Sequence, residues 1–338
     1  MNNEYAEPEP VFVVGMNGSG TTMLLDNLGR HSLLYAFPRE TRLIPYLIAN
    51  QHRFGDLEKD ENFKKLWQEV LGLTVFESVN GYKKLSLPAD WREYPRSLAA
   101  VLDGVFRCFS VREGKQRWCE KTPQHVQNIQ QLAELFPLAR FIHVVRDGRD
   151  AAASFSRRWH RTPELTVFRW KKVVGEGHRQ GQLLGRERYM EVRYEDLTTS
   201  PEHWLQEICR FLAVPFEPAV LQSTQPYLNA ATPHSGDTQF GTLKPNSGNW
   251  KKYFTARKLR RLDNIAGAML AGFGYESSRP AADFDPPAWK RRIWSVRDDL
   301  TQYLREIGLK LSGKISRPWS VILSKPFVAW RQRSENKY

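Results

Sequence analysis

Short runs of apolar and β-branched residues alternate with longer amphipathic segments along most of the chain. The apolar runs predict buried strands, and the amphipathic segments, whose hydrophobic positions recur with the helical period, predict helices. The expected strands are residues 11–14, 33–36, 116–120, 140–146 and 188–193, and the expected helices include 43–50, 97–111, 151–159, 163–186, 200–212 and 257–272. Such alternation predicts an α/β fold, a P-loop-like three-layer sandwich with a central, mainly parallel sheet flanked by helices.

Two stretches depart from this alternation. Residues 51–96 form a mixed insertion, within which an apolar and aromatic stripe recurs at helical spacing: Phe63, Leu66, Trp67, Val70 and Leu71. We interpret this stripe as core packing rather than as a binding surface. Residues 221–250 carry few regular signals, and a loop of this length inside a domain is usually functional or disordered.

The first strand leads into a glycine-rich segment, residues 15–20, and then into a helix that begins at Thr21. The N–H groups of such a loop converge at the helix N-terminus, where the helix dipole adds positive potential. We therefore predict a phosphate site rather than only a tight turn. The spacing almost matches the Walker A pattern, but Thr21 stands where that pattern has the lysine that neutralises a triphosphate. A ligand with a single 5′-phosphate is thus favoured.

A second strand–turn–helix unit predicts a second anion site. Arg146 ends the fourth strand, Ser154 lies in the helix that follows, and Arg158 falls one turn later on the same helix face. Two cations and a hydroxyl near this strand end predict an anion site in addition to the glycine-rich loop. Two anion sites in one chain indicate a ligand with two separate phosphates. Arg149 has the alternative of pairing with an aspartate of the same turn.

Three charged residues follow the carboxyl ends of expected strands. Glu40 and Arg42 come after the second strand, and Lys121 comes after the third. Residues just past the carboxyl ends of parallel strands line the ligand crevice, so we expect these side chains at one site. The alternative for Glu40 is a carboxylate in the first turn of a helix, and the alternative for Lys121 is a solvated loop position.

Composition narrows the ligand class and the compartment. The 338 residues carry a formal net charge of +13, which favours an anionic ligand, an acidic substrate or a negative membrane surface. The sequence has no zinc-finger, RNP or homeodomain-like pattern, so no nucleic acid partner is expected. The three cysteines are widely spaced and predict reduced thiols in a cytoplasmic protein. Neither a metal site nor a membrane span is expected.

The composition shifts from Pro280 onward. Residues 289–294 and 314–333 mix basic residues with Trp, Ile, Leu and Phe. Three interpretations stay open: a peripheral element at the inner membrane face, a helical pair packed on the domain, or a semi-ordered tail. The expected organisation is a disordered N-terminus (1–10), a main domain (11–278) and a basic aromatic C-terminal extension (279–338).

With both anion units placed, the sequence resembles the sulfotransferases that use 3′-phosphoadenosine 5′-phosphosulfate (PAPS), closest to the tyrosylprotein, Golgi-type and bacterial branch. The resemblance runs from about Val11 to Tyr275. Its motifs are Asn17-Gly-Ser-Gly-Thr-Thr22 for the 5′-phosphosulfate loop, Glu40-Thr-Arg-Leu-Ile-Pro45 for the catalytic base, Glu120-Lys-Thr-Pro123 for the lysine loop, Arg146-Asp-Gly-Arg-Asp150 with Ser154 for the 3′-phosphate, Val192-Arg-Tyr-Glu-Asp-Leu197 for the adenine nucleotide, and residues 244–250 for a late loop over the nucleotide.

The resemblance implies in-line transfer of the sulfuryl group from PAPS to an acceptor hydroxyl, with PAP as the product and no metal. It implies that Glu40 is the general base, that Lys121 stabilises charge on the leaving oxygen, and that Arg42 belongs to the same catalytic group. The nucleotide-binding residues that it implies are Asn17, Gly18, Ser19, Gly20, Thr21, Thr22, Arg146, Ser154, Tyr194, Lys244, Asn249 and Trp250.

Gly18 departs from the family pattern, which usually has Arg or Lys at this loop position. That cation helps to neutralise the 5′-phosphosulfate. Its absence leaves the loop amides and a cation from elsewhere, such as Lys121, Arg42 or Lys244, to do so, or else it lowers the activity.

Two other classes of function stay open. A P-loop kinase or nucleotide hydrolase requires a lysine where Thr21 stands, together with magnesium-binding acids after a strand. A non-catalytic anion-binding relative fits the net charge of +13 and Gly18. For a sulfotransferase, the acceptor hydroxyl can belong to a glycan, a lipid, a peptide tyrosine or a small molecule, and the basic surface suits an acidic acceptor. The sequence does not indicate an oligomeric state.

Overall fold

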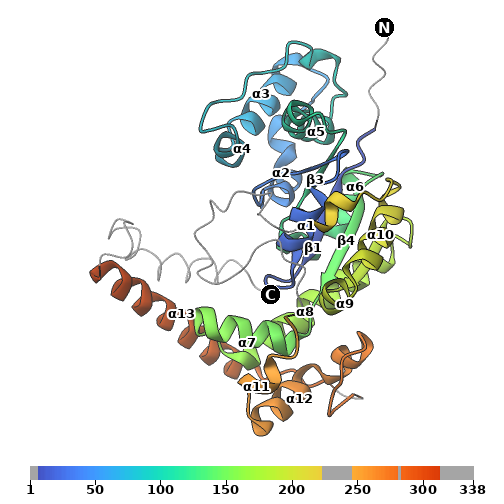
Figure 1. The fold of residues 1–338 in the computed structure, drawn as a ribbon. Helices are drawn as coiled ribbons and strands as arrows, with labels where there is room; N and C mark the ends of the chain where they lie inside the picture. The colour runs from blue at the N-terminus through green and yellow to red at the C-terminus, as the bar shows by residue number, and fades with distance from the viewer. Residues whose placement is uncertain (1–6, 223–245, 281–282, 313–338) are drawn as a thin grey trace. The chain divides into compact units, whose positions relative to one another are not determined.

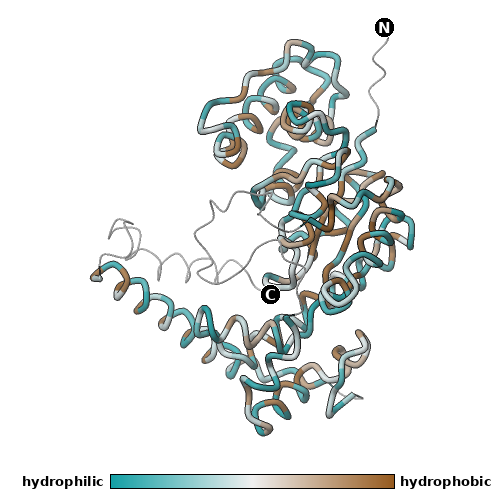
Figure 2. Tube along the Cα trace, in the orientation of Figure 1, coloured by the Kyte–Doolittle hydropathy of each residue, from teal (hydrophilic) through white to brown (hydrophobic). Residues whose placement is uncertain are grey.

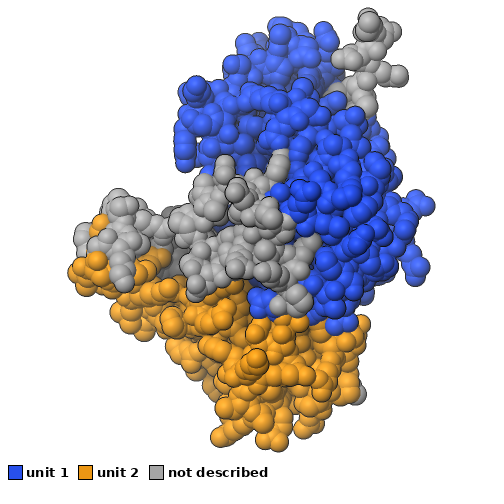
Figure 3. Space-filling view, viewed as in Figure 1, with its two compact units in different colours: residues 1–146, 173–246 blue, residues 147–172, 247–338 orange. Residues whose placement is uncertain are grey.

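The computed structural model describes residues 7–222, 246–280 and 283–312 (Figure 1). The chain divides into two compact units, which Figure 3 colours separately. The first unit comprises residues 1–146 and 173–246, and the second comprises residues 147–172 and 247–338. Residues on both sides of the expected boundary between the main domain and the C-terminal extension, at residue 278, belong to the second unit. That boundary stays a prediction.

A five-stranded sheet with the order β2-β3-β1-β4-β5 forms the centre of the first unit. All four neighbouring strand pairs are parallel. The strands are β1 (Val11–Gly15), β2 (Leu34–Ala36), β3 (Arg117–Glu120), β4 (Arg140–Val145) and β5 (Tyr189–Arg193). The α/β fold with a parallel sheet flanked by helices is therefore confirmed, and each predicted strand is present to within a few residues.

Alternate side chains of β1 pack into two different cores, because successive residues of a strand point to opposite faces of the sheet. Phe12 and Val14 belong to one core, in which the Phe12 ring stacks on Phe141 with the centroids 5.3 Å apart. Val11 and Val13 belong to the other. This two-sided burial explains why the strand is apolar throughout rather than alternating, and Figure 2 shows the strands as largely hydrophobic.

Helices pack around the sheet within the first unit: α1 (Thr21–Leu28), α2 (Ile44–Asn50), α3 (Asp60–Leu71), α4 (Thr74–Val79), α5 (Leu98–Ser110), α6 (Ile129–Leu135), α9 (Tyr194–Thr199) and α10 (Pro201–Leu212). The aromatic stripe of residues 63–71 lies on α3 and is buried in the core, so its interpretation as core packing is confirmed. Residues 1–6 lie outside the described residues. Pro10, at the end of the segment predicted to be disordered, is buried and accepts a hydrogen bond from the Arg140 N–H at 3.0 Å.

The second unit is helical in its described residues: α7 (Gly148–Trp159), the first part of α8 (Pro163–Gln182), α11 (Trp250–Tyr253), α12 (Ala256–Gly272) and α13 (Ala288–Leu311). Helix α7 begins earlier than its predicted start at residue 151, because the Asp147 side chain caps it by accepting a hydrogen bond from the Arg149 N–H at 2.8 Å. Within the described ranges, no helix has the length and apolar composition that a bilayer-spanning segment needs.

Candidate active site

The loop between β1 and α1 has the conformation of an anion cradle. Gly18 and Gly20 adopt φ angles of 84° and 99°, which residues with a side chain rarely adopt. A hydrogen bond of 3.0 Å from the Ser19 N–H to the Met16 carbonyl closes the loop. The Ser19 hydroxyl is buried and has no hydrogen-bond partner among the described residues. Together with the first N–H groups of α1, this hydroxyl fits an anionic ligand group.

Arg146 and Tyr194 lie against this loop. The Arg146 guanidinium donates to the Gly18 carbonyl at 3.0 Å and to the Asn246 carbonyl at 2.6 Å. It also covers the Tyr194 ring, with its central carbon 4.4 Å from the ring centroid. A Cβ atom on Gly20 would lie only 2.5 Å from the Tyr194 ring, so the close approach of this ring requires glycine. The fold thus brings four of the predicted nucleotide-binding residues together.

The contact between Arg146 and Gly18 bears on the cation that the loop lacks. The sequence suggests Lys121, Arg42 and Lys244 as cations that replace the missing one. It assigns Arg146 to the second anion site. In the structure the Arg146 guanidinium lies directly beside the Gly18 backbone. Lys244 lies outside the described residues. A positive charge is therefore present next to the loop although position 18 carries no side chain.

Glu40, Arg42 and Lys121 meet beyond the carboxyl ends of β2 and β3. The Lys121 ammonium donates to Glu40 Oε1 at 2.8 Å, and Arg42 Nε donates to Glu40 Oε2 at 2.9 Å. Lys121 is buried, so it is not a solvated loop lysine. Glu40 lies outside helix α2, which begins at Ile44, so it is not a first-turn carboxylate either. The expectation that these three side chains share one site is met.

The electrostatic surroundings keep Glu40 ionised. Burial raises the pKa of the Glu40 carboxyl, but the charges and hydrogen bonds of Lys121 and Arg42 outweigh it, and the net pKa lies below its usual value. Arg42 adopts a φ of 54°, a left-handed conformation that is strained for a residue with a side chain. An ionised carboxylate held by two cations can accept a proton from a hydroxyl group.

Glu120, which is absent from the site predicted from sequence, connects the segment that carries Glu40 and Arg42 with the segment that carries Lys121. Its Oε1 atom accepts hydrogen bonds from the Thr41 N–H at 3.1 Å, the Thr41 hydroxyl at 3.0 Å and the Thr122 hydroxyl at 2.6 Å. The Thr122 hydroxyl oxygen accepts in turn from the Arg42 N–H at 3.3 Å. These bonds join the segment that carries Glu40 and Arg42 to the segment that carries Lys121.

The other oxygen of this fully buried carboxylate lies 3.0 Å from His125 Nδ1. Burial raises the pKa of Glu120, but His125 and the hydroxyl and amide donors lower it by a larger amount. The net pKa of Glu120 therefore lies below its usual value. The sequence signal for this network is a strand that ends in a glutamate and is followed, after Lys121, by a threonine. Its partner Thr41 is far away in the sequence, and no local pattern identifies it.

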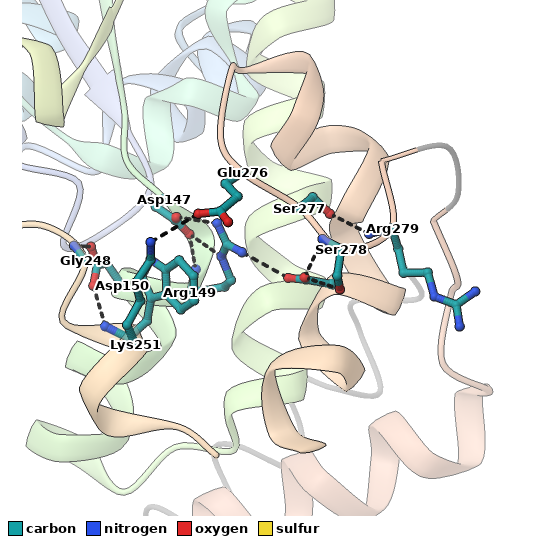
Figure 4. Close-up of polar contacts among 11 residues, drawn as sticks. Asp147, Arg149, Asp150, Gly248, Lys251, Glu276, Ser277, Ser278 and Arg279 are labelled. Carbon is teal, nitrogen blue, oxygen red and sulfur yellow. Dashed lines mark hydrogen bonds and ion pairs between the residues drawn. The ribbon is translucent and has the colours of Figure 1, made fainter. Parts of the chain in front are cut away.

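In the second unit, hydrogen bonds join the predicted second anion loop to the late loop, and buried ion pairs of Arg149 join it to helix α12 (Figure 4). Arg149 pairs with Asp147 at 2.8 Å and with Asp263 at 3.1 Å, which confirms the alternative that it pairs with an aspartate of its own turn. Its guanidinium carbon also lies 3.9 Å from the centroid of the Trp250 ring. Arg149 is therefore engaged by protein groups within this unit.

Asp150 is a second residue that the predicted site does not include. Its carboxylate accepts hydrogen bonds from the Gly248 N–H at 2.7 Å and the Trp250 N–H at 3.0 Å, so it holds the backbone on both sides of Asn249 (Figure 4). Ser154 lies buried on α7 of the same unit. Arg146 belongs to the first unit, so the pairing of Arg146 with Ser154 stays a prediction from the motif.

In the described part of the chain, no cluster of three His, Cys, Asp or Glu side chains is arranged to hold a metal ion. Cys108, Cys119 and Cys209 are free thiols. Burial raises the pKa of Cys119 to about 12, so this thiol stays protonated at neutral pH.

Comparison with known proteins gives concordant results. The family model described as the sulfotransferase family matches residues 10–218. The protein-tyrosine sulfotransferase of Drosophila melanogaster is 27% identical over 302 residues, which cover 82% of this chain and 54% of the fly protein. Protein-tyrosine sulfotransferase 1 of Danio rerio is 27% identical over 224 residues, which cover 62% of this chain and 55% of the fish protein. The chain thus spans about half the length of these curated relatives.

Among solved structures, the sulfotransferase domain of the Synechococcus PCC 7002 olefin synthase superposes with a TM-score of 0.54. It is 23% identical, and the match covers 82% of this chain and 98% of that domain. This likeness shows that the two chains share a fold.

Proposed function

The chain belongs to the sulfotransferase family, and we propose that it transfers the sulfuryl group of PAPS to an acceptor hydroxyl. The observation that carries this proposal is the Lys121–Glu40 contact of 2.8 Å, which places a buried ammonium next to an ionised carboxylate. The same unit contains the glycine loop with Arg146 beside it. A base, a cation for the leaving group and an anion cradle are the parts that sulfuryl transfer needs.

The glycine loop suits PAPS better than it suits a nucleoside triphosphate. PAPS carries one 5′-phosphosulfate and one 3′-phosphate, so it does not need the lysine that Thr21 replaces. The buried, unpartnered hydroxyl of Ser19 and the glycine-only backbone of the loop fit the 5′ group. We propose that residues 17–22 bind the 5′-phosphosulfate of PAPS and that Arg146 and Ser154 bind its 3′-phosphate. The residues proposed to bind the nucleoside are Tyr194, Lys244, Asn249 and Trp250.

PAPS supplies the sulfuryl group that is transferred. Glu40 accepts the proton of the acceptor hydroxyl, a role that its lowered pKa permits throughout the neutral range. Lys121 stabilises the negative charge that develops on the oxygen leaving the sulfur, and Arg42 orients the base through its ion pair with Glu40. Transfer is in-line and depends on positioning and charge stabilisation rather than on a covalent step with the protein.

Peptide tyrosine is the first acceptor class to test, because the relatives named above are protein-tyrosine sulfotransferases. The Arg42 side chain is 64% exposed beside the base, so it is available to an acidic group of the acceptor. Glycans, lipids and small phenols are the other classes. A cytoplasmic location stays a prediction from the cysteine content.

Three measurements test the proposal. PAP is expected to raise the melting temperature of the protein, and ATP with magnesium is expected not to, whereas the reverse result would indicate a kinase or nucleotide hydrolase. Arg146→Ala is expected to weaken PAP binding; the matched control is Arg112→Ala, which removes an exposed arginine that donates to Asn80 in the same unit. Labelled sulfate from PAPS should appear on tyrosine peptides or on another acceptor in a cell extract. PAP binding without transfer to any acceptor would indicate a non-catalytic relative.

A further inference from the structure

Helix α13 is held on the second unit by its polar side. Asp298, only 1% exposed, accepts hydrogen bonds from the Thr162 N–H at 3.0 Å and the Thr162 hydroxyl at 2.6 Å. Arg305 donates to the Arg158 carbonyl at 2.5 Å, and Gln302 donates to the Trp159 carbonyl. These contacts fix the rotation of the helix about its axis.

The opposite side of α13 is apolar and faces outward. Trp289, Ile293, Val296, Leu300, Leu304 and Leu311 recur at intervals of three, four or seven residues and are between 50% and 73% exposed. Residues at these intervals lie on one face of a helix. Hydrophobic and hydrophilic residues alternate along α13 in Figure 2, as an amphipathic helix requires. A helix in a globular unit normally buries its apolar stripe, so this inverted orientation leaves a continuous apolar surface for a partner.

The charges around this stripe indicate the chemistry of the partner. Lys290 borders it on one side, and Arg292 and Lys310 border it on the other, whereas the Arg297 guanidinium donates to the Thr162 hydroxyl at 2.6 Å. Trp289 stands at the start of the stripe, with the Lys290 ammonium 5.4 Å from the centroid of its ring. Tryptophan and lysine or arginine beside an apolar face suit the boundary between lipid headgroups and acyl chains. The sequence that follows, residues 314–333, repeats the mixture of basic and aromatic residues.

We propose that the apolar face of α13 docks on the surface of an anionic phospholipid membrane, with the helix lying in the plane of the interface. The 24-residue helix is about 36 Å long, and its row of basic residues would lie at the level of the negative headgroups. A second copy of the chain is a less suitable occupant, because it would bring two sets of these basic borders together. This inference does not depend on the sulfotransferase activity.

Co-sedimentation of the full-length protein with vesicles tests the proposal. Vesicles of phosphatidylcholine mixed with phosphatidylserine are expected to bind the protein, more weakly at high salt, and vesicles of phosphatidylcholine alone are expected to bind it at least about tenfold less. The double variant Ile293→Ser/Leu300→Ser should lower binding by at least about tenfold, because two exposed apolar side chains no longer enter the interface. The matched control is Val111→Ser/Leu183→Ser, which changes two exposed apolar residues of the first unit and should bind like the wild type.

Three results would overturn the proposal. The first is that anionic vesicles do not bind the protein. The second is that Ile293→Ser/Leu300→Ser binds as tightly as the wild type, which would assign binding to another basic region. The third, from light scattering, is a wild-type dimer that the same variant converts to a monomer, which would assign the stripe to a second copy. Circular dichroism and the melting temperature confirm that each variant is folded.

Discussion

The carboxylate of Glu120 accepts a hydrogen bond from the backbone N–H of Thr41 at 3.1 Å. Thr41 stands between Glu40 and Arg42, and Glu120 directly precedes Lys121. One buried carboxylate therefore fixes the distance between the proposed base and the proposed leaving-group cation, although it contacts neither side chain in the described network. It also helps to hold the strained backbone at Arg42, whose N–H donates to the Thr122 hydroxyl at 3.3 Å.

We expect Glu120→Gln to lower kcat by at least about tenfold while the affinity for PAP changes by less than about threefold. The amide keeps the shape of the side chain but loses the charge that three donors and His125 share, so the Glu40 segment loosens. Steady-state kinetics and PAP titration measure the two effects separately.

The control is Asp103→Asn, which alters another buried carboxylate of the same unit. Asp103 accepts from the Trp118 indole at 2.8 Å, whereas Glu120 accepts from Thr41 and Thr122. Both variants should melt at a lower temperature, but only Glu120→Gln should lose turnover in the folded protein. Equal losses of turnover in the two variants would mean that Glu120 acts through stability alone.

The amphipathic patterns and the rule for parallel strands were sufficient to predict the sheet and the meeting of Glu40, Arg42 and Lys121. Those inferences depend on local periodicity and on the geometry common to all parallel sheets. The glycine loop was predictable for the same reason, because its residues are contiguous in the sequence. What a periodic pattern does not encode is which buried acceptor a distant backbone N–H will meet.

Glu120 and Asp150 show this limit. Each belongs to one of the motifs quoted from the sequence, yet each acts on a segment that is remote in the sequence, residue 41 in one case and residues 248–250 in the other. The outward direction of the apolar stripe on α13 was also not predictable. It depends on the polar contacts of Asp298 with Thr162, and the hydropathy of the helix alone would favour burial of that stripe.

The pH dependence of the reaction should report the charges around Glu40. Lys121 and Arg42 lower the pKa of the Glu40 carboxyl despite its burial, so kcat/KM should stay on its plateau down to a pH below about 4.3, the usual pKa of glutamate. Lys121→Met removes one of the two cations that lower the pKa of Glu40. The effect of burial, which raises this pKa, is then less fully offset. The acid limb of kcat/KM should therefore move to higher pH, and kcat should fall by about 10² to 10³.

Glu40→Gln serves as the reference for this profile. It should abolish transfer and leave PAP binding nearly intact, because in the proposed mechanism the carboxylate accepts the acceptor's proton and does not hold the nucleotide. Retention of turnover in Glu40→Gln, or an acid limb that does not move in Lys121→Met, would contradict the role of Glu40 as the base.

Gly20→Ala should abolish PAP binding. Gly20 has a φ of 99°, and an added Cβ would lie 2.5 Å from the Tyr194 ring, so the ring must leave the loop and the Arg146 guanidinium loses the surface that it covers. Gly114→Ala is the matched control, because Gly114 also has a positive φ, 68°, but nothing lies within 4 Å of its added Cβ. It should cost only backbone strain, about 1 kcal/mol, and bind PAP normally. Calorimetric titration would distinguish them, and normal PAP affinity in Gly20→Ala would contradict the proposed nucleotide site.

Asp150→Ala should release the segment that carries Asn249 and Trp250. The Asp150 carboxylate accepts from the Gly248 and Trp250 N–H groups, and hydrogen bonds to a charged group contribute about 1.5–3 kcal/mol each. Hydrogen exchange of these two amides should therefore accelerate by at least about tenfold, and PAP should bind more weakly if Asn249 and Trp250 contact the nucleotide.

Asp263→Ala distinguishes this local effect from a general loosening of the second unit. Asp263 is also buried and also pairs with Arg149, but it accepts from the Ser278 N–H at 2.9 Å, in a different segment (Figure 4). Its removal should accelerate exchange at Ser278 and leave the Gly248 amide protected. If both variants accelerated exchange at Gly248 equally, Asp150 would have no specific hold on the late loop, and the loss of PAP affinity would have to be attributed to the stability of the whole unit.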